Sequence, residues 1–259
     1  MHLIGDPASP RIVTVRTGVD HTDGMKQWAG DKLKQLEKEE LHGFIFKSKS
    51  PSSGISDVRV YTSSGMPSKK GTGIFGGAFM LYFQLIPVID NGRLHNPNLR
   101  ENFIEQVLVY KRWREFLKKD TKIRNLIAFH TNLKFLILSH SPKHYSTLGK
   151  LVAQTKEYRP DMLYSQYAKI LMDGLRLLAT TKKNANVLLH IVGYFKAQLT
   201  SEDKRELLEI IGQYHKGYIT LIVPIVLINH YVRKFDEPYL KLQFYLNPHP
   251  VELMLRNHV

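Results

Sequence analysis

The stretch from Gly43 to Tyr61, GFIFKSKSPSSGISDVRVY, decides the fold of the first half of this chain. The apolar run Gly43–Lys47 predicts a strand, a turn rich in serine, proline and glycine follows, and Val58–Tyr61 predicts a second strand. A turn of this composition between two short strands is typical of a loop that holds a reactive site on a rigid scaffold. We therefore interpret the turn as half of such a site.

The residues before this stretch predict an α/β domain. The segment Pro10–Gly18 alternates like a strand, and Asp20–Leu41 combines a cap with apolar residues at helical spacing. The resulting strand, helix and strand order favours a right-handed crossover onto a parallel sheet.

The residues after it, Ser63–Phe79, predict a loop that leads into a helix near Phe75. Two interpretations stay open for the glycines of this loop. They could cradle a phosphate at the helix N-terminus, with charge supplied by Lys69 and Lys70, or they could form a plain flexible turn. These glycines are Gly71, Gly73, Gly76 and Gly77.

From Leu99 onward the apolar residues recur at helical spacing, so the second half is expected to be all-α. The predicted helices are Leu99–Lys119, Lys122–Ser139, His144–Lys156, Met162–Thr180, Asn184–Leu199, Glu202–Lys216, Ile219–Lys234 and Pro238–Leu246. At 259 residues two domains are the better expectation, and we place them at 1–119 and 120–259. The predicted fold class is α+β overall, an N-terminal α/β domain followed by an all-α helical domain.

Charge points to a polyanionic partner. Lysine and arginine outnumber aspartate and glutamate 37 to 23, which gives a formal net charge of +14 and a pI near 9.7. Nucleic acid is the leading candidate, because basic side chains neutralise phosphates and release counterions. The alternative is a basic surface that only confers solubility. No membrane span or secretory signal is visible, so we expect a cytoplasmic protein.

The chain has no cysteine. Disulfides, thiolate nucleophiles, cysteine zinc sites and ordinary iron–sulfur ligation are therefore excluded for its own side chains.

Several long motifs carry a resemblance to known families. GFIFKSKSPSSG, VRVY, GTGIFGGAF and GRLHNPNLRENFIEQVLVYKRW, within about 10–113, resemble the later part of the TudS-type thiouracil desulfidase domain. HSPKHYSTLGKLVA, LIVPIVLINHYVRKF and PYLKLQFYLNPHPVELMLRNHV, within about 122–259, resemble the YbgA domain of unknown function. Relatives with this fusion remove sulfur from 4-thiouridine in transfer RNA.

The resemblance implies a cofactor for which this sequence lacks ligands. In the family, three cysteines hold a 4Fe–4S cluster whose open iron takes the sulfur of the substrate, and the third cysteine belongs to an SPSCG turn. This chain has Ser53 at that position, and the other two cysteines would precede Met1. We therefore expect a truncated domain without a cofactor. Its turn is a vestige of the cluster site and comprises Ser50, Pro51, Ser52, Ser53 and Gly54.

The hypothesis that follows is an RNA-binding protein, with transfer RNA as the expected partner, that does not desulfurise by itself. A partial or Cys-to-Ser form of a thiouridine desulfidase is one alternative. A protein-interaction module, with a protein partner or a second copy of the chain, is another.

The candidate RNA contacts are basic residues and their aromatic neighbours. In the first half they are Lys47, Lys49, Lys69, Lys70, Arg93 and Arg100. In the second half they are Lys143, His144, Tyr145 and Lys150, at a helix start capped by Ser141 and Pro142, and His230, Tyr231, Arg233 and Lys234. Packing is an equal alternative for the two tyrosines, and a scaffold role is an equal alternative for the two arginines.

Two further features leave alternatives open. His140 and His144 have the spacing of metal ligands, but Pro142 breaks the helix between them, so no metal site is predicted. The C-terminal segment NPHPVELMLRNHV predicts either a polar site that includes Arg256 or a helix that docks on the bundle.

Overall fold

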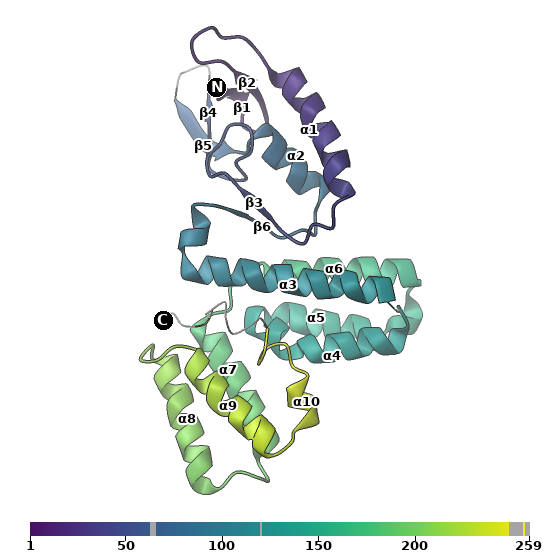
Figure 1. Cartoon of the computed structure of the whole chain (residues 1–259), viewed down its shortest axis with the longest axis vertical. Coiled ribbons are helices and arrows are strands. Elements are labelled where there is room, and N and C mark those ends of the chain that lie inside the picture. The colour runs from purple at the N-terminus through teal and green to yellow at the C-terminus, as the bar shows by residue number, and fades with distance from the viewer. Residues whose placement is uncertain (63–65, 120, 249–255, 257–259) are drawn as a thin grey trace. The chain divides into compact units, whose positions relative to one another are not determined.

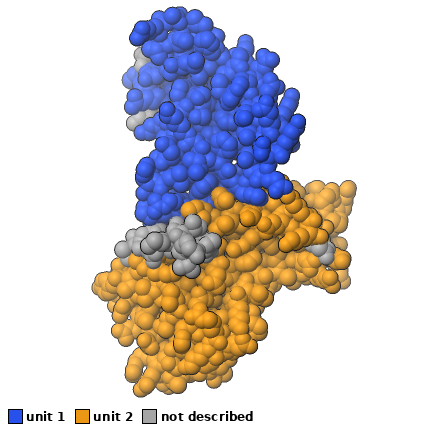
Figure 2. All heavy atoms as spheres, in the orientation of Figure 1, with its two compact units in different colours: residues 1–103 blue, residues 104–259 orange. Residues whose placement is uncertain are grey.

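The computed structural model describes residues 1–62, 66–119, 121–248 and 256. The chain forms two compact units, Met1–Phe103 and Ile104–Val259 (Figures 1 and 2). The first contains the strands and the second is helical. The predicted fold class, an α/β unit followed by a helical unit, is confirmed.

The larger sheet of the first unit has four strands in the order β2-β1-β4-β5. β1 (His2–Asp6) pairs antiparallel with β2 (Ser9–Val13) and parallel with β4 (Val58–Tyr61), and β5 (Pro67–Gly71) pairs antiparallel with β4. Its buried face is formed by Leu3, Ile12, Val58 and Val60. Burial of these alternate positions holds the register, because a slip of one residue would turn them to the other face.

The prediction of a loop over Ser63–Phe79 is wrong for its middle part, which is strand β5. Its sequence PSKKG has no apolar alternation, so the strand depends on pairing with β4 rather than on its own pattern. Gly71 makes the close pairing feasible, because a Cβ atom there would lie 2.4 Å from Cγ2 of Val60.

A second sheet consists of β3 (Phe44–Phe46) and β6 (Val88–Asp90), which are parallel. The helices α1 (Thr22–Glu37) and α2 (Ile74–Tyr82) lie side by side in the same unit (Figure 1). The rings of Phe44 and Phe46 pack against Phe79, with centroids 4.7 and 5.2 Å away, and so join β3 to α2.

The expected crossover between the strands around Asp20–Leu41 is wrong in its pairing. The first predicted strand ends at Val13, where Thr14–Gly18 closes a turn through a hydrogen bond from Gly18 N to Thr14 O. The parallel pairs are β1 with β4 and β3 with β6, so the strands on either side of α1 belong to different sheets.

The helical unit follows the predicted helices closely. The long helix α3 (Pro97–Lys119) contains the division between the units, and the helices after it are α4 (Ile123–His140), α5 (Pro142–Ala153), α6 (Pro160–Leu175), α7 (Thr181–Val192), α8 (Ser201–His215), α9 (Ile222–Lys234) and α10 (Pro238–Lys241). In the part of the chain that the structure describes, short 3-10 turns lie at Arg93–His95, Thr155–Glu157 and Gly193–Phe195. The last predicted helix is shorter than expected, because Phe244 N donates to Asn132 O of α4 instead of continuing α10.

The units divide at Phe103 and Ile104, whereas the sequence placed the boundary near Lys119. Trp113 explains the earlier division. It is 2% exposed, and its ring centroid lies 5.2 Å from that of Tyr167 and 5.5 Å from that of Phe129. The second part of α3 therefore belongs to the core of the helical unit.

Among the described residues, no helix combines the length and the apolar character needed to cross a membrane.

Candidate functional site

The serine turn, Ser50–Gly54, lies across the N-terminus of α2. Gly54 O accepts from Gly73 N at 2.7 Å, Ser52 O accepts from Phe75 N at 2.8 Å, and Pro51 O accepts from Ile74 N at 3.3 Å. The first turn of a helix has N–H groups without partners inside the helix, and here the carbonyls of the serine turn satisfy them. The main chain of the turn is thus the cap of α2.

The glycines that follow are required by this close contact. A Cβ atom at Gly73 would lie 2.5 Å from the carbonyl carbon of Ser52, and one at Gly76 would lie 2.6 Å from Gly54 O. Since the N–H groups of both glycines donate to the turn, they are not free to bind a phosphate. The structure contradicts both sequence interpretations at these glycines: they form neither a phosphate cradle nor a flexible turn.

Two of the three hydroxyls of the serine turn, those of Ser50 and Ser52, are in contact. Ser50 Oγ lies 3.1 Å from Ser52 Oγ and accepts from Ser53 N at 3.3 Å. Lys49, directly before the turn, and Asp57, three residues after it, have positive φ angles of 55° and 56°. Such backbone is strained for residues with a side chain, and it is enriched at functional loops.

A polar cluster lies directly beside the turn, at the carboxyl ends of the parallel strands β3 and β6. Ser48 Oγ lies 3.1 Å from Asp90 Oδ1 and 2.7 Å from Asn91 Oδ1, and it accepts from Gly92 N at 2.9 Å. Asp90 is only 7% exposed. Ligands of sheets with parallel strands bind at this edge. The sequence analysis missed Ser48, Asp90 and Asn91, although Ser48 directly follows the predicted strand Gly43–Lys47.

Arg93 links this cluster to the loop after the serine turn. Its Nε lies 3.4 Å from Asp90 Oδ2, and one Nη donates to Ser56 Oγ at 3.0 Å and lies 3.5 Å from Asp57 Oδ2. Its side chain remains 48% exposed. Arg93 therefore has both a structural partner and a face available to solvent.

The six basic candidates of the first unit divide into three groups. Lys47 and Lys49 are exposed next to the serine turn, and Arg93 joins them at the same strand edge. Arg100 is partly buried and donates to Leu94 O at 3.0 Å, which is a scaffold contact. Lys69 and Lys70 lie on β5 of the other sheet.

The donor atoms at the turn do not fit an iron–sulfur cluster. The turn and its neighbours offer hydroxyls, carboxylates and an amide, which are hard oxygen ligands. Iron in such clusters is held by soft thiolates, and the chain has no cysteine.

In the helical unit, the predicted helix start at Ser141 is confirmed. Ser141 Oγ accepts from His144 N at 3.3 Å and lies 2.8 Å from His144 Nδ1, and Pro142 occupies the first helical position. Lys143 and Lys150 are exposed. His144 is thus part of the cap of α5 rather than a partner of His140, which lies in α4.

Tyr231 is a core residue, so its prediction as an RNA contact is wrong. It is 4% exposed, its ring stacks on Phe235, and its hydroxyl donates to Asp203 Oδ1 at 3.0 Å. Burial and the bond to Asp203 raise its pKa to about 12. The other candidates on α9, His230, Arg233 and Lys234, are exposed.

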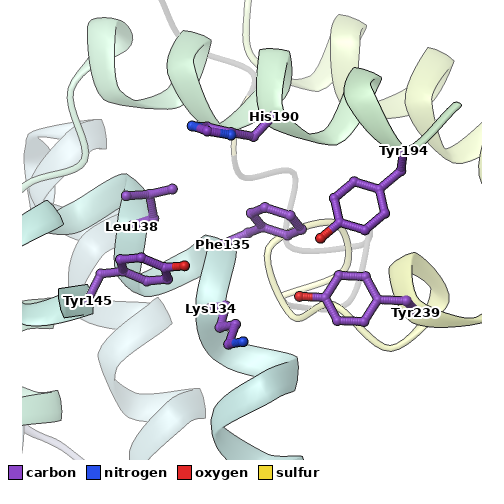
Figure 3. A pocket seen from close by; sticks show the side chains of 7 residues that line it. All are labelled: Lys134, Phe135, Leu138, Tyr145, His190, Tyr194 and Tyr239. Carbon is purple, nitrogen blue, oxygen red and sulfur yellow. The ribbon is translucent and has the colours of Figure 1, made fainter. Parts of the chain in front are cut away.

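Tyr145 instead lines a cavity of about 250 Å³ in the helical unit, which we name the tyrosine pocket (Figure 3). The pocket lies between α4, α5, α7, α10 and the 3-10 turn after α7. Its lining residues are Lys134, Phe135, Leu138, Tyr145, His190, Tyr194 and Tyr239. Only Tyr145 among them was a sequence candidate, because the others come from segments far apart in the chain.

A buried charged triad lies elsewhere in the helical unit. Glu105 is 5% exposed; its Oε2 lies 3.1 Å from His140 Nε2, and its Oε1 accepts from Arg256 at 3.0 Å. His140 Nδ1 lies 2.6 Å from Leu177 O. Residues 249–255 and 257–259 of the C-terminal segment lie outside the described residues, so the choice between a polar site and a docked helix stays open there.

Comparison with known proteins agrees with this division of the chain. Residues 1–91 match the family 2-thiouracil desulfurase, and residues 134–250 match the family described as Protein of unknown function (DUF1722). The Escherichia coli protein named "Uncharacterized protein YbgA" is 30% identical over 133 residues, which cover 51% of this chain and 79% of that relative. No solved structure matches.

Proposed function

The chain belongs to the family of the Escherichia coli protein YbgA, joined to a domain of the 2-thiouracil desulfurase type, and from this premise we propose that it binds RNA. Transfer RNA is the proposed partner, and the strand edge around the serine turn is the proposed contact surface of the first unit.

The observation that carries this proposal is the basic rim of the serine turn. Lys47, Lys49 and Arg93 lie at one strand edge, beside the hydroxyls of the turn and the ends of β3 and β6. Cationic side chains recognise phosphates, whereas hydroxyls and amides can bind sugar or base edges. The net charge of +14 favours the same class of partner.

Desulfurisation by the residues of this chain is not part of the proposal. The chemistry of thiocarbonyl removal in the related domain needs a soft metal centre, and the turn offers oxygen donors in its place. A binding role requires only the charge and shape of the rim.

The test is a titration of fluorescently labelled transfer RNA, followed by anisotropy, at several salt concentrations. We expect a dissociation constant in the micromolar range or below that rises steeply between about 50 and 200 mM salt. Replacing Lys47 and Lys49 together by alanine is expected to weaken binding at least about tenfold and to lower the salt slope by about 2.

The matched control replaces Lys169 and Lys204 together by alanine, because both lysines are exposed, on α6 and α8, and this variant also removes two positive charges. Binding that is absent or insensitive to salt would contradict the proposal. Equal losses in the control and in the variant of Lys47 and Lys49 would show that net charge acts, rather than the rim.

A further inference from the structure

The tyrosine pocket has a rigid aromatic wall. Tyr194 and Tyr239 stack with their ring centroids 5.2 Å apart and their planes 10° from parallel. Phe135, which is 7% exposed, meets both rings edge-on at 6.0 and 6.2 Å. Three packed rings on three different elements leave little freedom to rearrange, so the wall is preorganised for a flat ligand.

Hydroxyl groups converge on the cavity. In Figure 3 the hydroxyls of Tyr145, Tyr194 and Tyr239 point toward its middle. Burial, together with the bond to Tyr194, raises the pKa of Tyr239 above its ordinary value. Tyr239 therefore keeps its proton at physiological pH and shares it with Tyr194, which leaves the hydroxyl of Tyr194 to donate a hydrogen bond to an oxygen atom of a ligand.

The charge of the lining selects anions. Lys134 supplies an ammonium group and His190 an imidazole, and Figure 3 shows them on opposite sides of the cavity. None of the seven lining residues is acidic. A cationic ligand would find no counterion there, whereas a phosphate or carboxylate would find both a charge and several donors.

Size restricts the ligand to one ring system and its substituents. Pockets for drug-sized molecules have volumes of about 300–1,000 Å³, and this cavity, at about 250 Å³, lies just below that range. The lining carries no nucleophile with an adjacent base, which favours binding over catalysis.

We propose that the tyrosine pocket binds one nucleotide unit, with its base against the Tyr194–Tyr239 wall and its phosphate between Lys134 and His190. The unit can be a free mononucleotide or an unpaired nucleotide of an RNA chain, since both present the same chemistry. This site is separate from the basic rim of the serine turn and does not depend on the function proposed for that rim.

The test is isothermal titration of the full chain with uridine and adenosine monophosphates, with the corresponding nucleosides, with inorganic phosphate, and with a short single-stranded oligoribonucleotide. Mononucleotides are expected to bind at least about tenfold more tightly than nucleosides or phosphate alone, because only they contact both the aromatic wall and the basic side chains Lys134 and His190. An oligoribonucleotide that binds more than tenfold tighter than the monophosphates would identify RNA as the source. Comparable affinities would identify the free nucleotide.

Variants separate the two parts of the site. Tyr194→Ala removes half of the stacked wall and is expected to weaken nucleotide binding about tenfold, since stacking of one base contributes about 1–3 kcal/mol. Lys134→Gln is expected to reduce nucleotide affinity by a similar factor while leaving nucleoside affinity unchanged. Tyr218→Ala and Lys169→Gln are matched controls, because both residues are exposed and neither lines the pocket.

Tyr194 is 44% exposed, so its replacement is compatible with folding, and circular dichroism would verify this. The proposal is overturned if neither monophosphates nor the oligoribonucleotide bind, or if Tyr194→Ala and Tyr218→Ala bind them equally. If the double variant of Lys47 and Lys49 loses transfer RNA binding and Tyr194→Ala keeps it, the basic rim of the serine turn binds transfer RNA without the tyrosine pocket.

Discussion

At the scale of single residues, Glu105 is the centre of a buried polar cluster in the helical unit. Its Oε2 lies 3.1 Å from Nε2 of His140, and its Oε1 accepts a hydrogen bond from Arg256. Burial alone would raise the pKa of Glu105, but the hydrogen bond from His140 and the charge of Arg256 outweigh it and lower this pKa to about 2. Glu105 is therefore ionised at physiological pH and forms an ion pair with the buried guanidinium of Arg256.

Replacing Glu105 by glutamine would remove the carboxylate that pairs with Arg256 and lies within hydrogen-bond distance of His140. Removing one partner of a buried ion pair costs about 3–5 kcal/mol, because the remaining charge stays desolvated. We expect a loss of this size in the free energy of unfolding, measured by urea denaturation. Glu115→Gln, on the exposed side of the same helix, is the control and should lower stability by less than about 1 kcal/mol. Equal effects of the two substitutions would contradict the role of the triad.

The residues that sequence reasoning missed share a property: their partners are remote. Glu105 and Arg256 are 151 positions apart, and Ser48 and Asn91 are 43 apart. Local patterns carry no information on such pairs. The serine turn was found from the sequence because its composition is local, whereas the carboxylate beside it depends on the pairing of β3 with β6.

At the scale of elements, α8 shows how a cap also connects two helices. Thr200 Oγ1 accepts from Asp203 N at 3.1 Å, and Asp203 Oδ2 accepts from Thr200 N at 3.3 Å, which completes a capping box. Asp203 also accepts the hydroxyl of Tyr231 on α9. The cap of one helix therefore fixes the position of the next.

Replacing Thr200 by alanine should destabilise the helical unit by about 1 kcal/mol, the usual contribution of an N-cap hydroxyl. The loss would be read from the midpoint of urea denaturation, followed by circular dichroism at 222 nm, a helix signal. Ser146→Ala, at an exposed position inside α5, is the control and should be neutral or slightly stabilising because alanine favours helices. The role of the cap would be disproved by an unchanged midpoint in Thr200→Ala.

Helices were predictable from the sequence and several strands were not. The helical period of the second half depends only on neighbours within each helix, and it also places Tyr231 in line with the buried Pro224 and Ile228, a signal that marks it as packing. By contrast, β5 is polar and short, and it exists because β4 offers it a partner. Pairing between strands is decided by the tertiary structure.

At the scale of the whole molecule, acid should unfold the protein in two separate ranges of pH. His130 is 3% exposed and lies 3.2 Å from the hydroxyl of Tyr167. Burial, with a contribution from the charge of Lys134, lowers its pKa to about 4. Glu105 remains ionised until the pH approaches about 2.

The direction in which stability changes with pH follows from the unfolded chain, in which the pKa of histidine is about 6.5. Above that pH His130 is neutral in both the folded and the unfolded chain, and its contribution to the free energy of unfolding is fully present. As the pH falls from about 6.5 to 4 the unfolded chain takes up the proton first, so stability should drop by about 3 kcal/mol. Glu105 should add a second loss as the pH falls from about 4.5 toward 2.

The measurement is the free energy of unfolding by urea at pH values from 7.5 to 3, for the parent chain and for His130→Gln. In the His130→Gln variant the free energy of unfolding should no longer fall between about pH 6.5 and 4, because glutamine does not titrate. Parallel curves for the two proteins would rule out His130 as the origin of the first loss.

The serine turn holds α2 with its main-chain carbonyls and leaves its side chains outside that task. The side chain of Ser53 is not part of this cap, so Ser53→Cys would place a thiol on the turn without removing any of the main-chain hydrogen bonds that hold α2.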